Sequence, residues 1–190
     1  MKVIEQEIHS LKNSISEMWA LVHQQLYNAG EAMLTGDKEL AYKVISRERR
    51  VNAFELKIDS DCEDIIALYA PVAIDLRFVL AMYKINTNLE RLGDFAESIA
   101  RFAGNLPEGE PIDPQLVKET RVEEMLSELL SMISLTKEAF EKESSEIASR
   151  IFLKDNLIDE INHNSTAIIA KYIEEHKGSA LAGYPGLCTV

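Results

Sequence analysis

The apolar residues of this chain recur at steps of three and four over long, nearly uninterrupted stretches, which is the period of an α-helix. The first stretch, 3–34, carries Ile4, Ile8, Leu11 and Ile15 in this pattern. No run of Val, Ile or Thr alternates with polar residues as a half-buried β-strand would. The sequence therefore predicts an all-α protein.

Glycine and proline divide the chain into five expected helices. Asp37 and Asp113 stand where N-caps are needed, and Pro114 follows at the first helical position. Long helices with short connections pack as antiparallel, up-down bundles. The expected helical ranges are 3–34, 38–69, 72–103, 114–142 and 145–176.

The helices suggest two tandem units. Residues 1–105 would form a three-helix repeat, 106–113 a linker, 114–177 an incomplete second repeat of two helices, and 178–190 an irregular tail. At an offset of 100 positions, Glu55 and Asp59 fall on Asp155 and Asp159, which fits either pseudo-symmetry or coincidence between acidic helices. The second unit lacks a third helix. It would pack on the first unit, be completed by a partner chain, or have a truncated or altered C-terminus.

The charge of the chain limits its partners. Lys and Arg total 20 and Asp and Glu total 32, a net charge of −12. This balance argues against nucleic acid and for cationic partners or metal ions. The longest apolar stretch, Ile65–Ile74, is broken by Pro71, and the N-terminus has no signal-peptide core. Two cysteines, Cys62 and Cys188, imply no disulfide framework, so we expect a cytoplasmic protein.

Carboxylates four residues apart are the main candidate for chemistry. Such pairs repel on a helix, and a hard multivalent cation would relieve the repulsion; a solvated acidic face is the alternative. The flank of 72–103 that carries Asn86 would form a multi-carboxylate groove if it faced the flank of 38–69. The candidate carboxylates are Glu55, Asp59, Glu90, Asp94, Glu97, Asp155 and Asp159.

Enzyme motifs are lacking. A ferritin-like di-metal site needs two Glu-x-x-His motifs, and only Glu160 and His163 form one. The chain has no Gly-x-Ser-x-Gly elbow and no phosphate-binding glycine loop. We therefore expect a binding protein rather than an enzyme.

Two strings identify a family. Leu89-Glu90-Arg91-Leu92-Gly93-Asp94, preceded by the segment 71–77 (Pro-Val-Ala-Ile-Asp-Leu-Arg), resembles the signature of the PhoU family of phosphate-signalling proteins. Arg47-Glu48, Val51-Asn52 and the Glu55/Asp59 pair in the preceding helix also resemble that family. The resemblance is close over 1–105 and weaker over 114–176.

The resemblance implies two three-helix bundles, metal binding by the carboxylate pairs, and no enzymatic activity. The metal could be iron, zinc, manganese, magnesium or calcium. It also implies a homodimer that curbs phosphate uptake and the phosphate-starvation response. It would do so by binding, at the membrane complex, the phosphate ABC transporter ATPase and its sensor histidine kinase. Asp75, Arg77 and Arg91, within the matching strings, are candidates for partner contact.

One departure from the family pattern bears on the second site. The family's sixth helix carries a second Leu-Glu-Arg-x-Gly-Asp string, which is missing here, so Asp155 and Asp159 would lack half of their co-ligands. Two other functions stay open. The chain could be an accessory subunit of a low-affinity phosphate permease, or a metal-carboxylate enzyme of the bundle type.

Overall fold

The computed structural model describes residues 3–107 and 111–176, and these form helices and connections without any β-strand. The expected all-α class is therefore confirmed. The elements are α1 Val3–Thr35, α2 Lys38–Tyr69, α3 Ile74–Asn105, α4 Pro114–Thr120, α5 Val122–Glu141 and α6 Ser145–Glu175.

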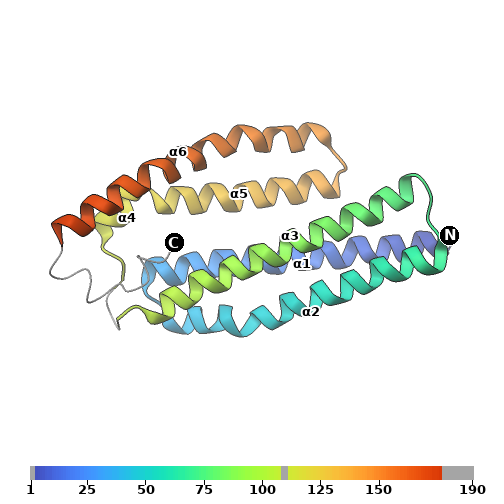
Figure 1. The fold of residues 1–190 in the computed structure, drawn as a ribbon, viewed down its shortest axis with the longest axis horizontal. Coiled ribbons are helices and arrows are strands. Elements are labelled where there is room, and N and C mark those ends of the chain that lie inside the picture. Colours follow the sequence, from blue (N-terminus) through green and yellow to red (C-terminus); the bar gives the residue numbers. More distant parts are fainter. Residues whose placement is uncertain (1–2, 108–110, 177–190) are drawn as a thin grey trace.

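The first three helices form an up-down-up bundle along the long axis of the molecule (Figure 1). Gly36, with φ of 70°, makes the turn after α1, and Asp37 caps α2 by accepting a hydrogen bond from the Leu40 amide. Both features follow from the sequence, because glycine adopts positive φ freely and aspartate satisfies a free helical N–H. The buried stripe of α2 repeats every seven residues at Val44, Val51, Ile58 and Ile65.

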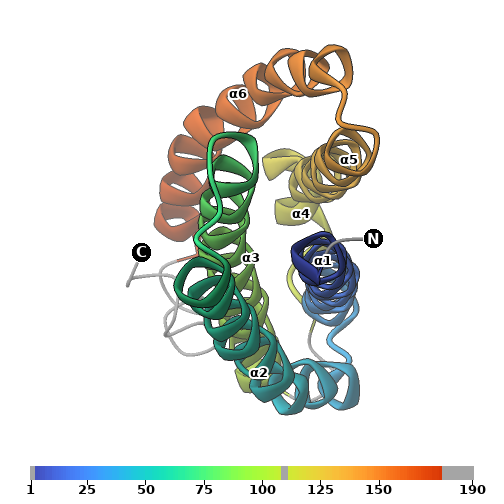
Figure 2. The same cartoon turned by 90° about the vertical axis from the view of Figure 1, so that its right-hand side faces the viewer.

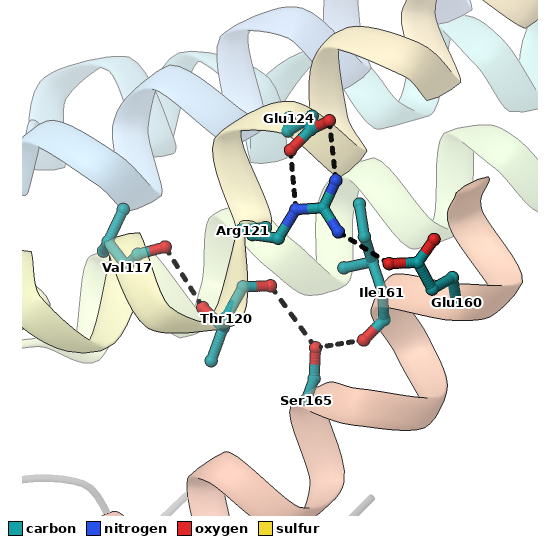
Figure 3. Close-up of polar contacts among 7 residues, drawn as sticks. All are labelled: Val117, Thr120, Arg121, Glu124, Glu160, Ile161 and Ser165. Carbon is teal, nitrogen blue, oxygen red and sulfur yellow. Dashed lines mark hydrogen bonds and ion pairs between the residues drawn. The ribbon is translucent and has the colours of Figure 1, made fainter.

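The predicted helix 114–142 is wrong in one respect: it is broken at Arg121. This residue has φ of 54° and ψ of 30°, so it ends α4 and begins α5. Its guanidinium donates to both carboxylate oxygens of Glu124 and, at 2.9 Å, to Glu160 on α6 (Figure 3). The apolar period continues on both sides of the break, so periodicity alone does not reveal it.

Contacts at the bend between α4 and α5 also hold α6 in place. Thr120 bonds back to the main-chain oxygens of Leu116 and Val117, and Ser165 on α6 donates to the Thr120 oxygen at 3.4 Å and to the Ile161 oxygen at 2.6 Å (Figure 3). Ile161, 1% exposed, is the buried residue of α6 at this point. The bend at Arg121 is therefore held by side chains from all three helices.

The second unit packs on the first through α5 and α1, and α6 covers the outer side of α5 (Figure 2). Trp19 on α1 stacks on Phe140 of α5 with ring centroids 5.8 Å apart. Lys12 pairs with Glu143 just beyond α5 at 2.8 Å, and the Ser134 hydroxyl lies 3.0 Å from the His23 ring. Of the arrangements left open by the sequence, the structure supports packing of the second unit on the first.

The sequence predicts neither a membrane-spanning helix nor a disulfide framework. Within the described ranges no helix is both long and apolar enough to cross a membrane. Cys62 is buried in the α1–α3 core, and burial raises the pKa of its thiol to about 12. Cys188 and the predicted irregular tail, 178–190, lie outside the described residues.

Candidate functional site

The predicted acidic flanks of α2 and α3 do face each other. The two helices pack side by side along the bundle, with Glu55 and Asp59 on α2 and Glu90, Asp94 and Glu97 on α3. Because residues at steps of three, four and seven share one side of a helix, each group forms a row rather than a scatter. We call Glu48 and these five residues the carboxylate face.

The carboxyl groups of the carboxylate face repel one another, both within α3 and across to α2. Burial raises the pKa of Glu90, and repulsion from Asp94 and then Glu55 raises it further; the Glu90 and Asp94 carboxyl groups are also within hydrogen-bonding reach. The ionised state of this cluster is therefore disfavoured unless a cation balances it. The apolar walls of the bundle strengthen the repulsion, because they exclude part of the solvent.

Glu48 belongs to the same group, although the sequence analysis did not select it as a site residue. Burial raises its pKa, followed by repulsion from Glu97 and Asp94. Asn52 lowers it by donating a hydrogen bond of 2.9 Å to the Glu48 carboxylate. The available signal was spacing, because Glu48 lies seven residues before Glu55 and therefore on the same side of α2.

Asn86 on α3 forms hydrogen bonds to the α2 side of the carboxylate face. It is fully buried, and its Nδ2 donates to the Glu55 main-chain oxygen at 2.9 Å and to Asp59 Oδ1 at 2.7 Å. Its Oδ1 has no hydrogen-bond partner within the described part of the chain. Such an oxygen is costly to bury, and it is a ligand type that hard cations accept.

The donor chemistry of the face suits a hard cation, since it consists of carboxylates and one buried amide oxygen. Within 3–107 and 111–176, however, no group of three or more His, Cys, Asp or Glu side chains is arranged to hold a metal ion. The side chains would have to converge to form a coordination sphere.

The other predicted site residues are dispersed. Asp155 and Asp159 are exposed on α6, which packs mainly on α5 and α4. Asp75 and Arg77 are exposed in the first turn of α3, and Arg91 is exposed near its middle. The structure thus gathers the predicted carboxylates of the first unit and leaves those of the second unit apart.

Comparison with known proteins shows which family has this architecture. A family model described as the PhoU domain matches residues 15–103, within α1 to α3. A phosphate-specific transport system accessory protein PhoU homolog of Aquifex aeolicus is 33% identical over 171 residues, covering 89% of this chain and 75% of that protein. The chain belongs to the PhoU family. The PhoU of Escherichia coli is 34% identical over 154 residues, covering 81% of this chain and 62% of that protein.

Solved PhoU structures match most of the chain. The crystal structure of PhoU from Pseudomonas aeruginosa matches with a TM-score of 0.84 at 27% identity, covering 91% of this chain and 81% of that chain. The phosphate transport system regulatory protein PhoU from Streptococcus pneumoniae gives a TM-score of 0.80 at 28% identity, covering 91% and 80%. The predicted PhoU resemblance is confirmed. The relatives of A. aeolicus and E. coli are named as accessory proteins of a phosphate-specific transport system, and that of S. pneumoniae as a phosphate transport system regulatory protein.

Proposed function

We propose that this chain is a PhoU-type regulator of phosphate homeostasis. In phosphate-replete cells it would bind the phosphate ABC transporter ATPase and the sensor histidine kinase, restrain phosphate uptake and keep the starvation response repressed. The observation that supports this most strongly is the similarity to transport-system PhoU proteins, which extends over 89% of the chain. The chain would act from the cytoplasmic side, at the membrane complex and without a catalytic step.

A reporter for the starvation response tests this function. In a strain lacking its own PhoU, we expect the reporter to be active despite abundant phosphate and to be repressed when this chain is expressed. Repression should disappear when phosphate is withdrawn. A reporter that stays fully active, with the chain present at normal abundance, would contradict the proposal.

We further propose that the carboxylate face binds a multivalent metal ion. Glu55 and Asp59 from α2 and Glu90 and Asp94 from α3 would supply the ligands, with Glu97 and Glu48 beside them. The raised pKa values of Glu48 and Glu90 support this assignment, since burial and then repulsion from neighbouring carboxylates disfavour the ionised form of both groups. So does the unpartnered Oδ1 of Asn86. Asp155 and Asp159 would form at most a weaker second site, because they are exposed on α6.

Metal analysis of the purified protein checks this. We expect bound iron, zinc, manganese, magnesium or calcium in the wild type and its loss in Glu55→Ala/Asp59→Ala/Glu90→Ala/Asp94→Ala. Glu63→Ala/Asp64→Ala on the exposed side of α2 is the matched control, because it removes charges of the same type outside the face. Equal metal content in all three proteins would show that these carboxylates are only solvated.

The chain is also proposed to form a homodimer. Large apolar side chains exposed on α6, Phe152 and Leu153, support association with a second protein surface. Light scattering at micromolar concentration should give about twice the chain mass of 21.4 kDa. A monomeric mass would exclude the dimer and leave the regulatory proposal intact.

A further inference from the structure

The connection between α2 and α3 exposes an unusual concentration of apolar side chains. Leu68 in the last turn of α2, Val72 in the connection and Ile74 at the start of α3 are 72%, 74% and 79% exposed. We call these three residues the α2–α3 tip. Single exposed apolar residues are ordinary on a protein surface, but three within seven positions at one end of a bundle form a patch, and such patches mark interaction sites.

The backbone holds the tip in a defined shape. Ala70 has φ of 44° and ψ of 57°, and Ala73 has φ of 48° and ψ of −107°, although neither residue is glycine. Hydrogen bonds fix the turn: the Ala70 amide donates to the Ile66 oxygen, the Asp75 amide to the Val72 oxygen, and the Arg77 amide to the Ala73 oxygen. Strained backbone of this kind persists only where surrounding structure enforces it, and it concentrates at functional sites.

The tip rests on a rigid base. Pro71 is buried between the exposed residues, and Ile65 and Val79 beneath the connection are 2% and 0% exposed. The Cys62 thiol donates to the Val79 oxygen, which ties α2 to α3 one turn further in. In Figure 1 the connection lies at the end of the bundle where α1 begins, on the outside of the molecule. A preformed apolar projection needs little ordering when it binds, which favours affinity.

The charged residues near the tip indicate whether a protein or a lipid bilayer can bind there. Glu63, Asp64 and Asp75 are exposed acidic residues within five positions of one of the three apolar residues, and Arg77 is the exposed cation within 63–77. An acidic rim opposes binding to anionic lipid headgroups and favours lysine or arginine on the opposing surface. The rim therefore points to a protein partner rather than to a bilayer.

We propose that the α2–α3 tip is a docking surface that inserts Leu68, Val72 and Ile74 into an apolar pocket, edged by basic residues, on a partner protein. This inference rests on the proposed function, for which it supplies the contact surface. The segment 71–77 resembles the family signature, but the patch itself is a property of the described structure. Asp75 would then contribute to the rim of the docking surface.

Photo-cross-linking tests the proposal in phosphate-replete cells. The chain carries Val72→p-benzoyl-phenylalanine, and the adducts are identified by mass spectrometry of the cross-linked peptide. We expect one predominant protein adduct whose cross-linked segment combines apolar residues with neighbouring Lys or Arg. Leu68→Ser in the same chain should lower its yield at least about tenfold, the factor expected for losing one buried leucine.

Leu56→Ser is the matched control. Leu56 lies on the same helix, is 69% exposed against 72% for Leu68, and is about 18 Å from it at 1.5 Å per helical residue. It should leave the yield unchanged, and both serine variants should keep the wild-type circular dichroism spectrum and melting curve. A lipid adduct, an adduct with a second copy of this chain, no adduct at all, or equal losses with both serine variants would each overturn the proposal.

The starvation reporter separates this inference from the proposed function. Wild-type repression with no effect of Leu68→Ser on either the adduct or the reporter would reject the tip while the regulatory function stands. A Leu68-dependent adduct in cells where the wild-type chain never represses the reporter would retain the docking surface and reject the regulatory function.

Discussion

The indole Nε1 of Trp19 on α1 donates a hydrogen bond to the main-chain oxygen of Ile133 on α5, with the two atoms 3.2 Å apart. This contact crosses from the first helical unit to the second, and the Trp19 ring also stacks on Phe140. The relative placement of the two units therefore depends strongly on one side chain that is 5% exposed.

Replacing Trp19 should weaken the whole fold. We expect Trp19→Ala to lower the free energy of unfolding by about 3–5 kcal/mol, because it removes a large buried ring and leaves a cavity between α1 and α5. Urea denaturation measures the change. Lys12→Ala, which removes the ion pair with Glu143 and the cation–π contact with the Phe140 ring, should cost no more than about 1–2 kcal/mol. Similar costs for the two variants would show that the interface is not centred on Trp19.

Gly30 and Leu126 make a second close contact between α1 and α5. A Cβ atom at Gly30 would lie 2.1 Å from Leu126 Cδ2 and 3.1 Å from its Cγ, so Gly30→Ala should destabilise the wild type by about 1–2 kcal/mol despite its better helix propensity. In a Leu126→Ala background the same substitution should become stabilising by up to about 1 kcal/mol. A double-mutant cycle measures both steps, and additivity would contradict the contact.

The carboxylate face predicts a pH dependence for the metal-free protein. Burial and repulsion raise the pKa of Glu90 in the folded state. The folded state therefore holds this proton more tightly than the unfolded state, and stability falls as pH rises above the unfolded pKa of about 4.3.

Glu90→Gln should remove this loss. With chelator present, we expect a gain of about 0.2–0.5 kcal/mol at pH 7 and none at about pH 3, where the wild-type carboxyl is protonated in both states. Thermal melts across this range measure it. Glu63→Gln, on an exposed part of α2, is the control and should not show this difference between the two pH values. A destabilising Glu90→Gln at pH 7 would show that the repulsion is already compensated.

Because the turn after α2 is strained, we expect glycine substitutions at two nearby alanines to change the free energy of unfolding in opposite directions. Ala70 has positive φ, so Ala70→Gly should raise the free energy of unfolding by up to about 1 kcal/mol. Ala67 is exposed inside α2, so Ala67→Gly should lower it by about 1 kcal/mol. Denaturant melts of both variants decide the matter, and two losses of equal size would mean that Ala70 is not strained.

The elements that could be predicted from the sequence are those encoded locally. Apolar residues at steps of three and four predicted the long helices α1, α2 and α3, and Asp37 and Asp113 predicted where helices begin. The break at Arg121 could not be predicted in this way, because the apolar period runs through it. Part of what holds it is the contact of Arg121 with Glu160, which is 39 residues away along the chain.

The candidate site was predictable to the same extent. Spacing of three, four and seven placed Glu55 with Asp59 and Glu90 with Asp94 on single sides of their helices, and the packing of α2 on α3 brings the two rows together. The pairing of Asn52 with Glu48 is a local contact between residues four apart on α2. The burial of Asn86, by contrast, depends on tertiary contacts, which no local pattern reports. The exposed α2–α3 tip likewise emerges only once exposure is known.

The central claim is that this chain regulates the phosphate ABC transporter, and co-purification tests it most directly. The tagged chain would be purified from detergent-solubilised membranes of phosphate-replete cells, with a tagged E. coli PhoU processed in parallel. We predict recovery of the phosphate transporter ATPase or of the sensor kinase with both baits. Recovery of a phosphate permease alone, or of neither partner while the E. coli bait recovers its own, would contradict the account.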